Sequence, residues 1–286
     1  MSQRTLLREL NVGRDNNALM EIGSRMGVLS VFPIAIENDI LFSEDTLFKL
    51  ELNGQVFPVS KKWLKIRDVN SYSFYGQGDS NNLMLSFLNE DIQGVLTIDN
   101  HSYSIETYQN ECYIVQIDNT ILHEDCDGLD MSVVQDVGND RLQEMEESGV
   151  EIISSEHVMN RFHDGSGDIK VLVMYTPAAA NSVSNIVNTA YLAEELSNQS
   201  FDNSSIACKI EVVYIGKTDY VEVGSQFDVD RFQGTSDGYM DEVHSLRDKY
   251  AADVCVLLTD YHLSTCGRAT RIKANSDSAF CVVQAY

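Results

Sequence analysis

Positive charge is scarce in this sequence, and the scarcity excludes two classes of partner. Its 286 residues contain 20 Lys and Arg against 44 Asp and Glu, which gives a formal net charge of -24. A chain this acidic repels nucleic acid and anionic membrane surfaces, and no basic cluster offsets the repulsion. We therefore expect no nucleic-acid partner and no binding to a membrane surface.

Long apolar runs and several common catalytic motifs are also missing. No stretch of about 18 apolar residues could span a membrane, so no membrane span is expected, and the start from Met1 to Glu9 lacks the apolar core of a secretory signal. The sequence has no G-x-S-x-G elbow, no P-loop and no G-x-G-x-x-G. Serine hydrolase, nucleotide hydrolase and dinucleotide-binding functions therefore have no local support.

The cysteines form no C-x-x-C pair, which leaves a zinc ribbon or a redox site without support. Cys208 and Cys255 lie in apolar strand-like runs, where a buried free thiol is expected. Cys266 and Cys281 can bridge neighbouring strands, or either can have another partner. The even count of six permits disulfides without fixing their pairing.

From about residue 27 to residue 118, strands and turns alternate. Asn53-Gly54 separates two strand-like runs and is the strongest short-range hairpin signal. We expect an antiparallel β domain. Its predicted strands are Gly27 to Ile36, Thr46 to Leu52, Gln55 to Ser60, Leu83 to Leu88, Gly94 to Ile98, Tyr103 to Thr107 and Cys112 to Ile117.

After Asp168 the pattern changes to alternating strands and helices. Ile169 to Tyr175 is a continuous apolar run suited to a central strand buried on both faces. Thr176-Pro177 supplies an N-cap and an N1 proline for a helix on which Val183, Ile186, Val187 and Ala190 share one face. Further strands are expected at Ile206 to Ile215, Ala252 to Leu258, Cys266 to Thr270 and Ala279 to Tyr286, with a helix over Met240 to Tyr250.

The fold class expected for the whole chain is α+β, in two domains joined by a linker. Residues 1–134 form the β domain, and residues 168–286 form an α/β unit with a mixed sheet. Residues 135–167 are acidic and polar and include Gly165-Ser166-Gly167, which is typical of a linker.

Six segments follow one another in a fixed order through residues 168–286: Ile169 to Pro177, Asn198 to Ser204, Ile210 to Tyr214, Leu246 to Val254, Cys266 to Ala269 and Ala279 to Val283. In that order they resemble the metzincin zinc endopeptidases, specifically the secreted bacterial relatives of the reprolysin and adamalysin group. Three segments of the β domain, Gly94 to Asp99, Tyr103 to Glu106 and Tyr113 to Asp118, resemble the propeptide of the same proteases.

This resemblance implies the N-terminal part of a secreted zinc metalloendopeptidase zymogen that hydrolyses peptide bonds in proteins. The family signature H-E-x-x-H-x-x-G-x-x-H is absent, so the chain is expected to stop before the zinc-binding helix, to be inactive alone and to carry no zinc ligands. Zinc is expected in the intact enzyme. The histidines outside such a motif are His101, His123, His157, His163, His244 and His262.

The resemblance also implies roles for several residues. The short edge strand with Gly267, Arg268, Ala269 and Thr270 borders the substrate cleft and accepts a peptide as an added strand. The propeptide is expected to dock on its own catalytic domain until an activating protease cuts the linker.

Two linker-side residues have competing interpretations. Cys126 can act as a propeptide switch on zinc, or it can be a surface cysteine or a disulfide partner of Cys112. Arg161 can be the activation cleavage site or an ordinary exposed arginine. His163-Asp164 and the pair His262 with Cys266 do not supply three zinc ligands, and both groups are interpreted as polar linker and loop residues.

Two other functions stay open. The chain can be a non-catalytic propeptide-like inhibitor or a pseudoprotease that binds peptides. It can also be a small-molecule-binding α/β domain that uses the carboxyl ends of its strands.

Overall fold

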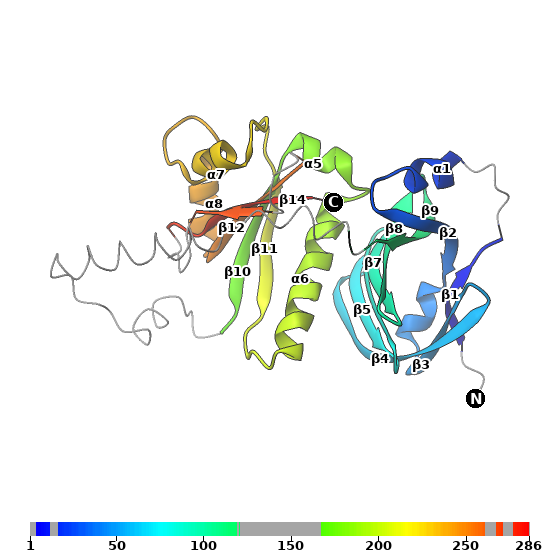
Figure 1. The fold of residues 1–286 in the computed structure, drawn as a ribbon. Helices are drawn as coiled ribbons and strands as arrows, with labels where there is room; N and C mark the ends of the chain where they lie inside the picture. The colour runs from blue at the N-terminus through cyan, green and yellow to red at the C-terminus, as the bar shows by residue number, and fades with distance from the viewer. Residues whose placement is uncertain are drawn as a thin grey trace. The chain divides into compact units, whose positions relative to one another are not determined.

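The computed structural model describes residues 4–11, 17–118, 120, 167–260, 267–270 and 277–285. Contacts divide the chain into two compact units (Figure 1). The first contains the described residues of Met1–Leu122 together with Val183–Ser200, and the second contains those of His123–Ser182 and Phe201–Tyr286. A short stretch from the C-terminal half of the chain thus groups with the N-terminal half.

Nine strands of the first unit close into a barrel (Figure 1). The order around it is β1-β2-β9-β8-β7-β6-β5-β4-β3, and β1 closes the ring by pairing with both β2 and β3. Closure gives every strand two neighbours, which removes the open edges of a sheet. The strands are β1 (Arg4–Glu9), β2 (Val28–Ile36), β3 (Leu47–Leu52), β4 (Gln55–Asp68), β5 (Ser71–Gln77), β6 (Asn81–Leu88), β7 (Asp91–Ile98), β8 (His101–Tyr108) and β9 (Glu111–Ile117).

Two-residue turns set the register of the hairpins. Between β3 and β4, Asn53 and Gly54 have φ angles of 53° and 71°. Asp99 and Asn100, between β7 and β8, have φ angles of 47° and 67°. Positive φ at both central residues is the type I′ geometry, whose twist matches that of the flanking strands. The hairpin predicted from Asn53-Gly54 is confirmed.

Apolar side chains fill the barrel interior. In β3, Phe48, Leu50 and Leu52 are buried while Lys49 and Glu51 are only half-buried, which is the period of two expected for a strand with one face inward. Each fully buried leucine or phenylalanine contributes about 1.5–3 kcal/mol relative to an exposed one. Burial of these side chains therefore contributes to the stability of this unit.

Two short helices accompany the barrel. Helix α1 (Asn17–Gly23) packs Ala18 and Ile22 against Tyr113 and Val115 of β9, which explains why consecutive residues of that strand are buried. A 3-10 helix, η1 (Asn38–Phe42), buries Leu41 in the barrel core.

The second unit contains a five-stranded mixed sheet in the order β11-β10-β12-β14-β13. All neighbours are parallel except β13 and β14, which are antiparallel. None of the described helices is long and apolar enough to cross a membrane. The strands are β10 (Ile169–Tyr175), β11 (Ile210–Lys217), β12 (Val254–Thr259), β13 (Gly267–Ala269) and β14 (Phe280–Gln284), and the helices of this unit are α5 (Pro177–Ser182), α7 (Ser225–Gln233) and α8 (Glu242–Tyr250). Most of helix α6 (Ile186–Asn203) lies in the stretch Val183–Ser200 and so belongs to the first unit.

The sheet of the second unit is covered by its own apolar core. Leu172, Cys255, Leu257 and Phe280 from the strands pack with Phe232 of α7. The prediction that residues 169–175 form a central strand is confirmed, because β10 pairs with β11 on one side and with β12 on the other. Burial of four consecutive residues in β10 fits the apolar run.

The structure corrects several predicted elements. The β region is a closed barrel with one parallel pair, β1 with β3, and not a wholly antiparallel domain. Strands β1 and β5, the second half of β4 and helix α7 are not predicted from the sequence at all. The helix predicted to run from Thr176-Pro177 through Ala190 is two helices, because Asn185 Oδ1 accepts bonds from the backbone N–H groups of Val187 and Asn188 and starts α6 anew.

The mostly β architecture with a barrel, a mixed sheet and a few helices is established by the structure. The division into residues 1–134, 135–167 and 168–286 stays a prediction. Most of the expected linker lies outside the described residues.

Candidate functional site

The short strand β13 lies at one edge of the mixed sheet and pairs with β14 on one side, with Gly267 opposite Val283 and Arg268 opposite Val282. The backbone N–H of Thr270 extends the pairing by donating to Phe280 O at 3.0 Å. Within the described part of the chain, no strand pairs with the other side of β13. Of the residues expected to form an edge strand, Cys266 to Thr270, the structure confirms strand conformation at Gly267, Arg268 and Ala269.

The register shows which backbone groups of β13 face away from β14. Hydrogen-bonded pairs alternate along an antiparallel ladder, so the bond at Thr270 makes Arg268 the next residue that faces β14. Ala269, which lies between them, directs its N–H and C=O toward the open side. Ala269 and Arg268 are both exposed. This geometry suits the addition of an extended peptide as a further strand.

The hydroxyl of Thr270 is not free for a ligand, because it donates to the Ser278 backbone carbonyl. The bond ties the end of β13 to the segment before β14. Gly267 and Thr270 are half-buried. Of the four residues expected to border a substrate cleft, Arg268 and Ala269 are thus the accessible ones.

A carboxylate joins the ends of two neighbouring parallel strands. Glu222 Oε1 accepts from the Asp260 backbone N–H at 3.0 Å, just after β12, and from the hydroxyl of Thr176, just after β10. Thr176 Oγ1 in turn accepts from the Ala179 backbone N–H at 3.1 Å, which confirms the predicted N-cap of α5. Glu222 is not identifiable from the sequence, because its partners are distant in the chain. The hydrogen bonds of Glu222 have a structural role, because they connect the residues that follow β10 and β12.

A buried carboxylate braces the loop before α7 in a similar way. Asp228 accepts from the Tyr220 hydroxyl at 2.6 Å and from the backbone N–H groups of Val223 and Gly224 at 2.9 and 3.1 Å. Burial raises the pKa of Tyr220 to about 12, and the bond to Asp228 adds to that rise. The phenol is protonated at neutral pH and serves as a donor.

The described residues do not fit a zinc site. Among them, no group of three or more His, Cys, Asp or Glu could hold a metal ion. His244 on α8 is half-buried; its Nε2 lies 2.8 Å from Gly234 O, and its ring centre lies 5.2 Å from that of Phe280. His101 is exposed at a turn of the barrel. We therefore derive no catalytic step through zinc from these residues.

The described cysteines are free thiols, namely Cys112, Cys208, Cys255 and Cys281. Cys255 is fully buried as expected, whereas Cys208 is only half-buried and precedes β11, so the prediction of a buried strand cysteine at that position is wrong. Burial raises the pKa of Cys255 to about 12 and that of Cys281 to about 11. Neither is a reactive thiolate at neutral pH.

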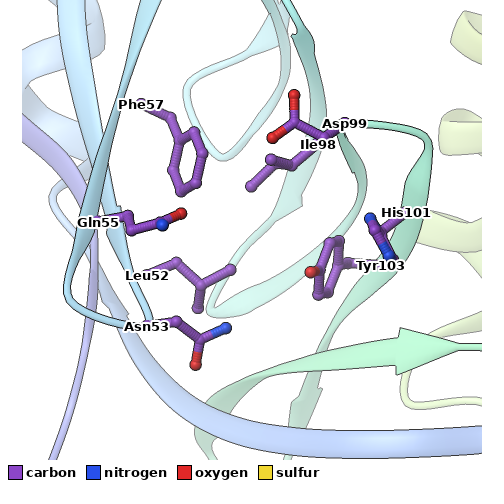
Figure 2. A pocket seen from close by; sticks show the side chains of 8 residues that line it. All are labelled: Leu52, Asn53, Gln55, Phe57, Ile98, Asp99, His101 and Tyr103. Carbon is purple, nitrogen blue, oxygen red and sulfur yellow. The ribbon is translucent and has the colours of Figure 1, made fainter.

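A small cavity of about 200 Å³ opens at one end of the barrel. Leu52, Phe57 and Ile98 turn toward a shared space between the β3–β4 and β7–β8 hairpins, as Figure 2 shows. Asp99 and His101, both exposed, come from the second hairpin. The cavity is smaller than pockets that hold drug-sized ligands.

Several predicted site residues lie outside the described part of the chain. These are Cys126, the expected propeptide switch, and Arg161, the expected cleavage site. The same holds for the remaining histidines and for Cys266. Their roles stay predictions.

The chain is similar to named metalloendopeptidases. It is 31% identical over 213 residues to a peptidyl-Asp metalloendopeptidase of Stenotrophomonas maltophilia, a match that covers 73% of this chain and 48% of the relative. It is 35% identical over 117 residues to a peptidyl-Asp metalloendopeptidase of Xanthomonas campestris, covering 40% of this chain and 28% of that protein. These matches support a metallopeptidase. The chain spans about half the length of the longer-matching relative.

Other comparisons add little. No protein-family model matches the chain. A solved structure of metalloproteinase-II from Bacteroides fragilis aligns with 84% of this chain and 75% of its own, at 11% identity and a TM-score of 0.42. A likeness of that size does not establish a shared fold or function, so the sequence relatives carry the functional argument.

Proposed function

We propose that this chain is the N-terminal portion of a secreted, zinc-dependent metalloendopeptidase precursor that hydrolyses peptide bonds in proteins. The barrel is its propeptide, and the mixed sheet belongs to its catalytic domain, of the metzincin type. The zinc ligands belong to a part of the protein outside the described residues. Because the relatives are named peptidyl-Asp metalloendopeptidases, we extend the proposal to protein substrates that contain aspartate.

One observation carries this proposal, and it is the extent of the similarity. The 213 matched residues exceed the length of the barrel region and also that of the mixed-sheet region. The match therefore includes parts of both. A relationship confined to the barrel or to the mixed sheet would give a shorter match. The length of the match therefore supports a precursor organisation shared with the relative.

The accessible backbone of β13 has a direct role in this function. A substrate held as an added strand is positioned by main-chain hydrogen bonds, which do not depend on its side-chain sequence. Ala269 supplies such groups on the open side of the strand. Arg268 places a cation beside them, which suits the carboxylate of an aspartate in a substrate.

The test begins with the coding sequence that follows Tyr286 in the source DNA. A continuation into H-E-x-x-H-x-x-G-x-x-H supports the proposal. The encoded protein is then expressed, and cleavage of a peptide containing one aspartate is compared with that of the same peptide carrying asparagine. We expect cleavage near the aspartate that a zinc chelator abolishes and added zinc restores.

Two results would contradict the proposal. One is a coding sequence without a zinc-binding helix, and the other is an encoded protein that binds peptides but never cleaves them. Either result would favour the alternative of a non-catalytic propeptide-like inhibitor or pseudoprotease. The open edge of β13 supports that alternative, because strand addition needs no metal.

A further inference from the structure

Four charged side chains meet in the first unit, where barrel strand β4 contacts helix α6. Lys65 Nζ lies 2.6 Å from Glu194 Oε1 and 2.8 Å from Glu195 Oε1. Arg67 Nη2 lies 3.6 Å from Glu194 Oε2 and also donates to Glu195 Oε1. The glutamate side chains are only 5% and 4% exposed. Two carboxylates are thus buried against two cations from a distant part of the chain.

Arg67 is held in place by further contacts. Its Nη1 donates to Ser73 Oγ of β5 at 2.8 Å, and its guanidinium carbon lies 4.3 Å from the ring centre of Tyr191 on α6. Burial works against the charge on Lys65, but hydrogen bonds to Glu194 and Glu195 raise its pKa overall. Lys65 is therefore charged at neutral pH.

Further polar contacts join α6 and the residue before it to strands β6 and β7 of the barrel. Asn188 Nδ2 on α6 donates to Asp91 Oδ2 at 2.6 Å and to Ser86 O at 3.1 Å. Gln93 of β7 donates to the Asn185 backbone carbonyl at 3.0 Å and accepts from the Thr189 hydroxyl at 2.9 Å.

This polar composition differs from that of the two apolar cores. When two surfaces packed through apolar side chains separate, apolar surface becomes exposed to water, which is unfavourable. When surfaces joined by charged and amide groups separate, those groups form hydrogen bonds to water instead. Interfaces that form and dissociate are more polar than permanent ones. The contact between β4 and α6 therefore has the composition of a reversible interface inside one chain.

We propose that the β4 face bearing Lys65 and Arg67 is a docking surface for helix α6, which holds the barrel on this helix without help from the covalent chain. The two glutamates are the recognised groups. A protein cut between residues 121 and 166 keeps its barrel attached and releases it when salt screens the four charges. The proposal stands whether or not the protein is a peptidase, because its readout is binding.

The experiment uses the full chain with a recognition sequence for a site-specific protease inserted between residues 140 and 150. After cutting, size-exclusion chromatography shows whether the two fragments elute together at 0.1 M NaCl and at 1 M NaCl, where the Debye length falls from about 10 Å to about 3 Å. We expect co-elution at low salt and separation at high salt. Fragments that separate at low salt, or that stay together irrespective of salt, would overturn the proposal.

Charge reversal tests the named residues. In the cut Lys65→Glu, Arg67→Glu protein we expect a loss of affinity of at least about 100-fold, because two buried carboxylates then face like charges. Combining it with Glu194→Lys and Glu195→Lys should restore at least about 10-fold of that loss.

The matched control is Arg8→Glu with Lys62→Glu. It changes the net charge by the same amount at two exposed barrel residues, and we expect it to leave co-elution at low salt unchanged. Circular dichroism of each uncut variant confirms that it is folded. Equal loss of binding in the control and the Lys65, Arg67 variant would show that net charge, and not this docking surface, holds the fragments together.

Discussion

Replacing Arg67 with alanine should destabilise the first unit more than removal of an exposed ion pair. The Arg67 side chain is 15% exposed, and its loss leaves Glu194 and Glu195 buried with Lys65 as their remaining cation. Removing one partner of a buried pair typically costs about 3–5 kcal/mol. Because Lys65 stays in place, we expect the lower part of that range, about 3 kcal/mol.

The matched control is Arg25→Ala. Arg25 pairs with Glu106 at 2.7 Å, but its side chain is 45% exposed. Exposed pairs contribute about 0–1 kcal/mol. The comparison thus holds the residue type constant, while the burial of the ion pair and the number of paired carboxylates differ.

The chain's single tryptophan provides the assay. Trp63 lies in β4, with its ring centre 5.7 Å from that of Tyr75, so its fluorescence reports on barrel unfolding in urea. The free energy of unfolding is compared among wild type, Arg67→Ala, Arg25→Ala, Glu195→Gln and the Arg67→Ala, Glu195→Gln double variant. A loss of less than about 1 kcal/mol for Arg67→Ala, with no coupling to Glu195→Gln, would refute the reasoning.

Three further predictions follow from particular contacts. Ala269→Pro removes the outward N–H of β13, so it should weaken binding of an extended aspartate-containing peptide about 10-fold relative to Ala269→Ser, as measured by fluorescence anisotropy; equal affinities would argue against strand addition. Gly94→Ala should destabilise the barrel by about 1–3 kcal/mol, because an added Cβ would lie 2.5 Å from Met84 O, whereas Gly23→Ala, whose Cβ would lie 3.8 Å from Val31, should change little; equal unfolding midpoints would contradict this. The Cys255 thiol has a pKa raised from 9.0 to about 12, so it stays protonated in the folded state while the unfolded thiol ionises. Its contribution to the stability of the second unit is therefore lost as pH rises from about 9 to about 12, by about 1.4 kcal/mol per pH unit, and Cys255→Ala should flatten the pH dependence in chemical denaturation; an unchanged slope would count against the burial argument.

Several elements were predictable because their causes are local. Asn53-Gly54 makes its hairpin through backbone conformations that these two residues readily adopt. Thr176 caps α5 through a bond that spans three residues. Two strands were also predictable, because their residue pattern and their order in the chain are enough to identify them. They are the short strand at Gly267, Arg268 and Ala269 and the apolar strand before Thr176.

Other features depend on partners that are distant in sequence. Strand β5, with the sequence Ser71–Gln77, was missed because its serines are buried by the structure around them, so hydrophobic alternation alone does not identify it. The break between α5 and α6 was missed because the apolar spacing continues across it. The roles of Cys126 and Arg161 are not tested by the described residues.

The sequence by itself determined the hairpin turn at Asn53-Gly54, the helix cap at Thr176, the acidic net charge and the resemblance to metalloendopeptidases, because each depends on composition, neighbouring residues or residue order. Only the tertiary structure decided that β1 closes a barrel by parallel pairing with β3. Only the tertiary structure joined Lys65 and Arg67 to Glu194 and Glu195. In the sequence these glutamates are two charges on a helix, and their burial follows from a contact across more than a hundred residues, which no local pattern encodes.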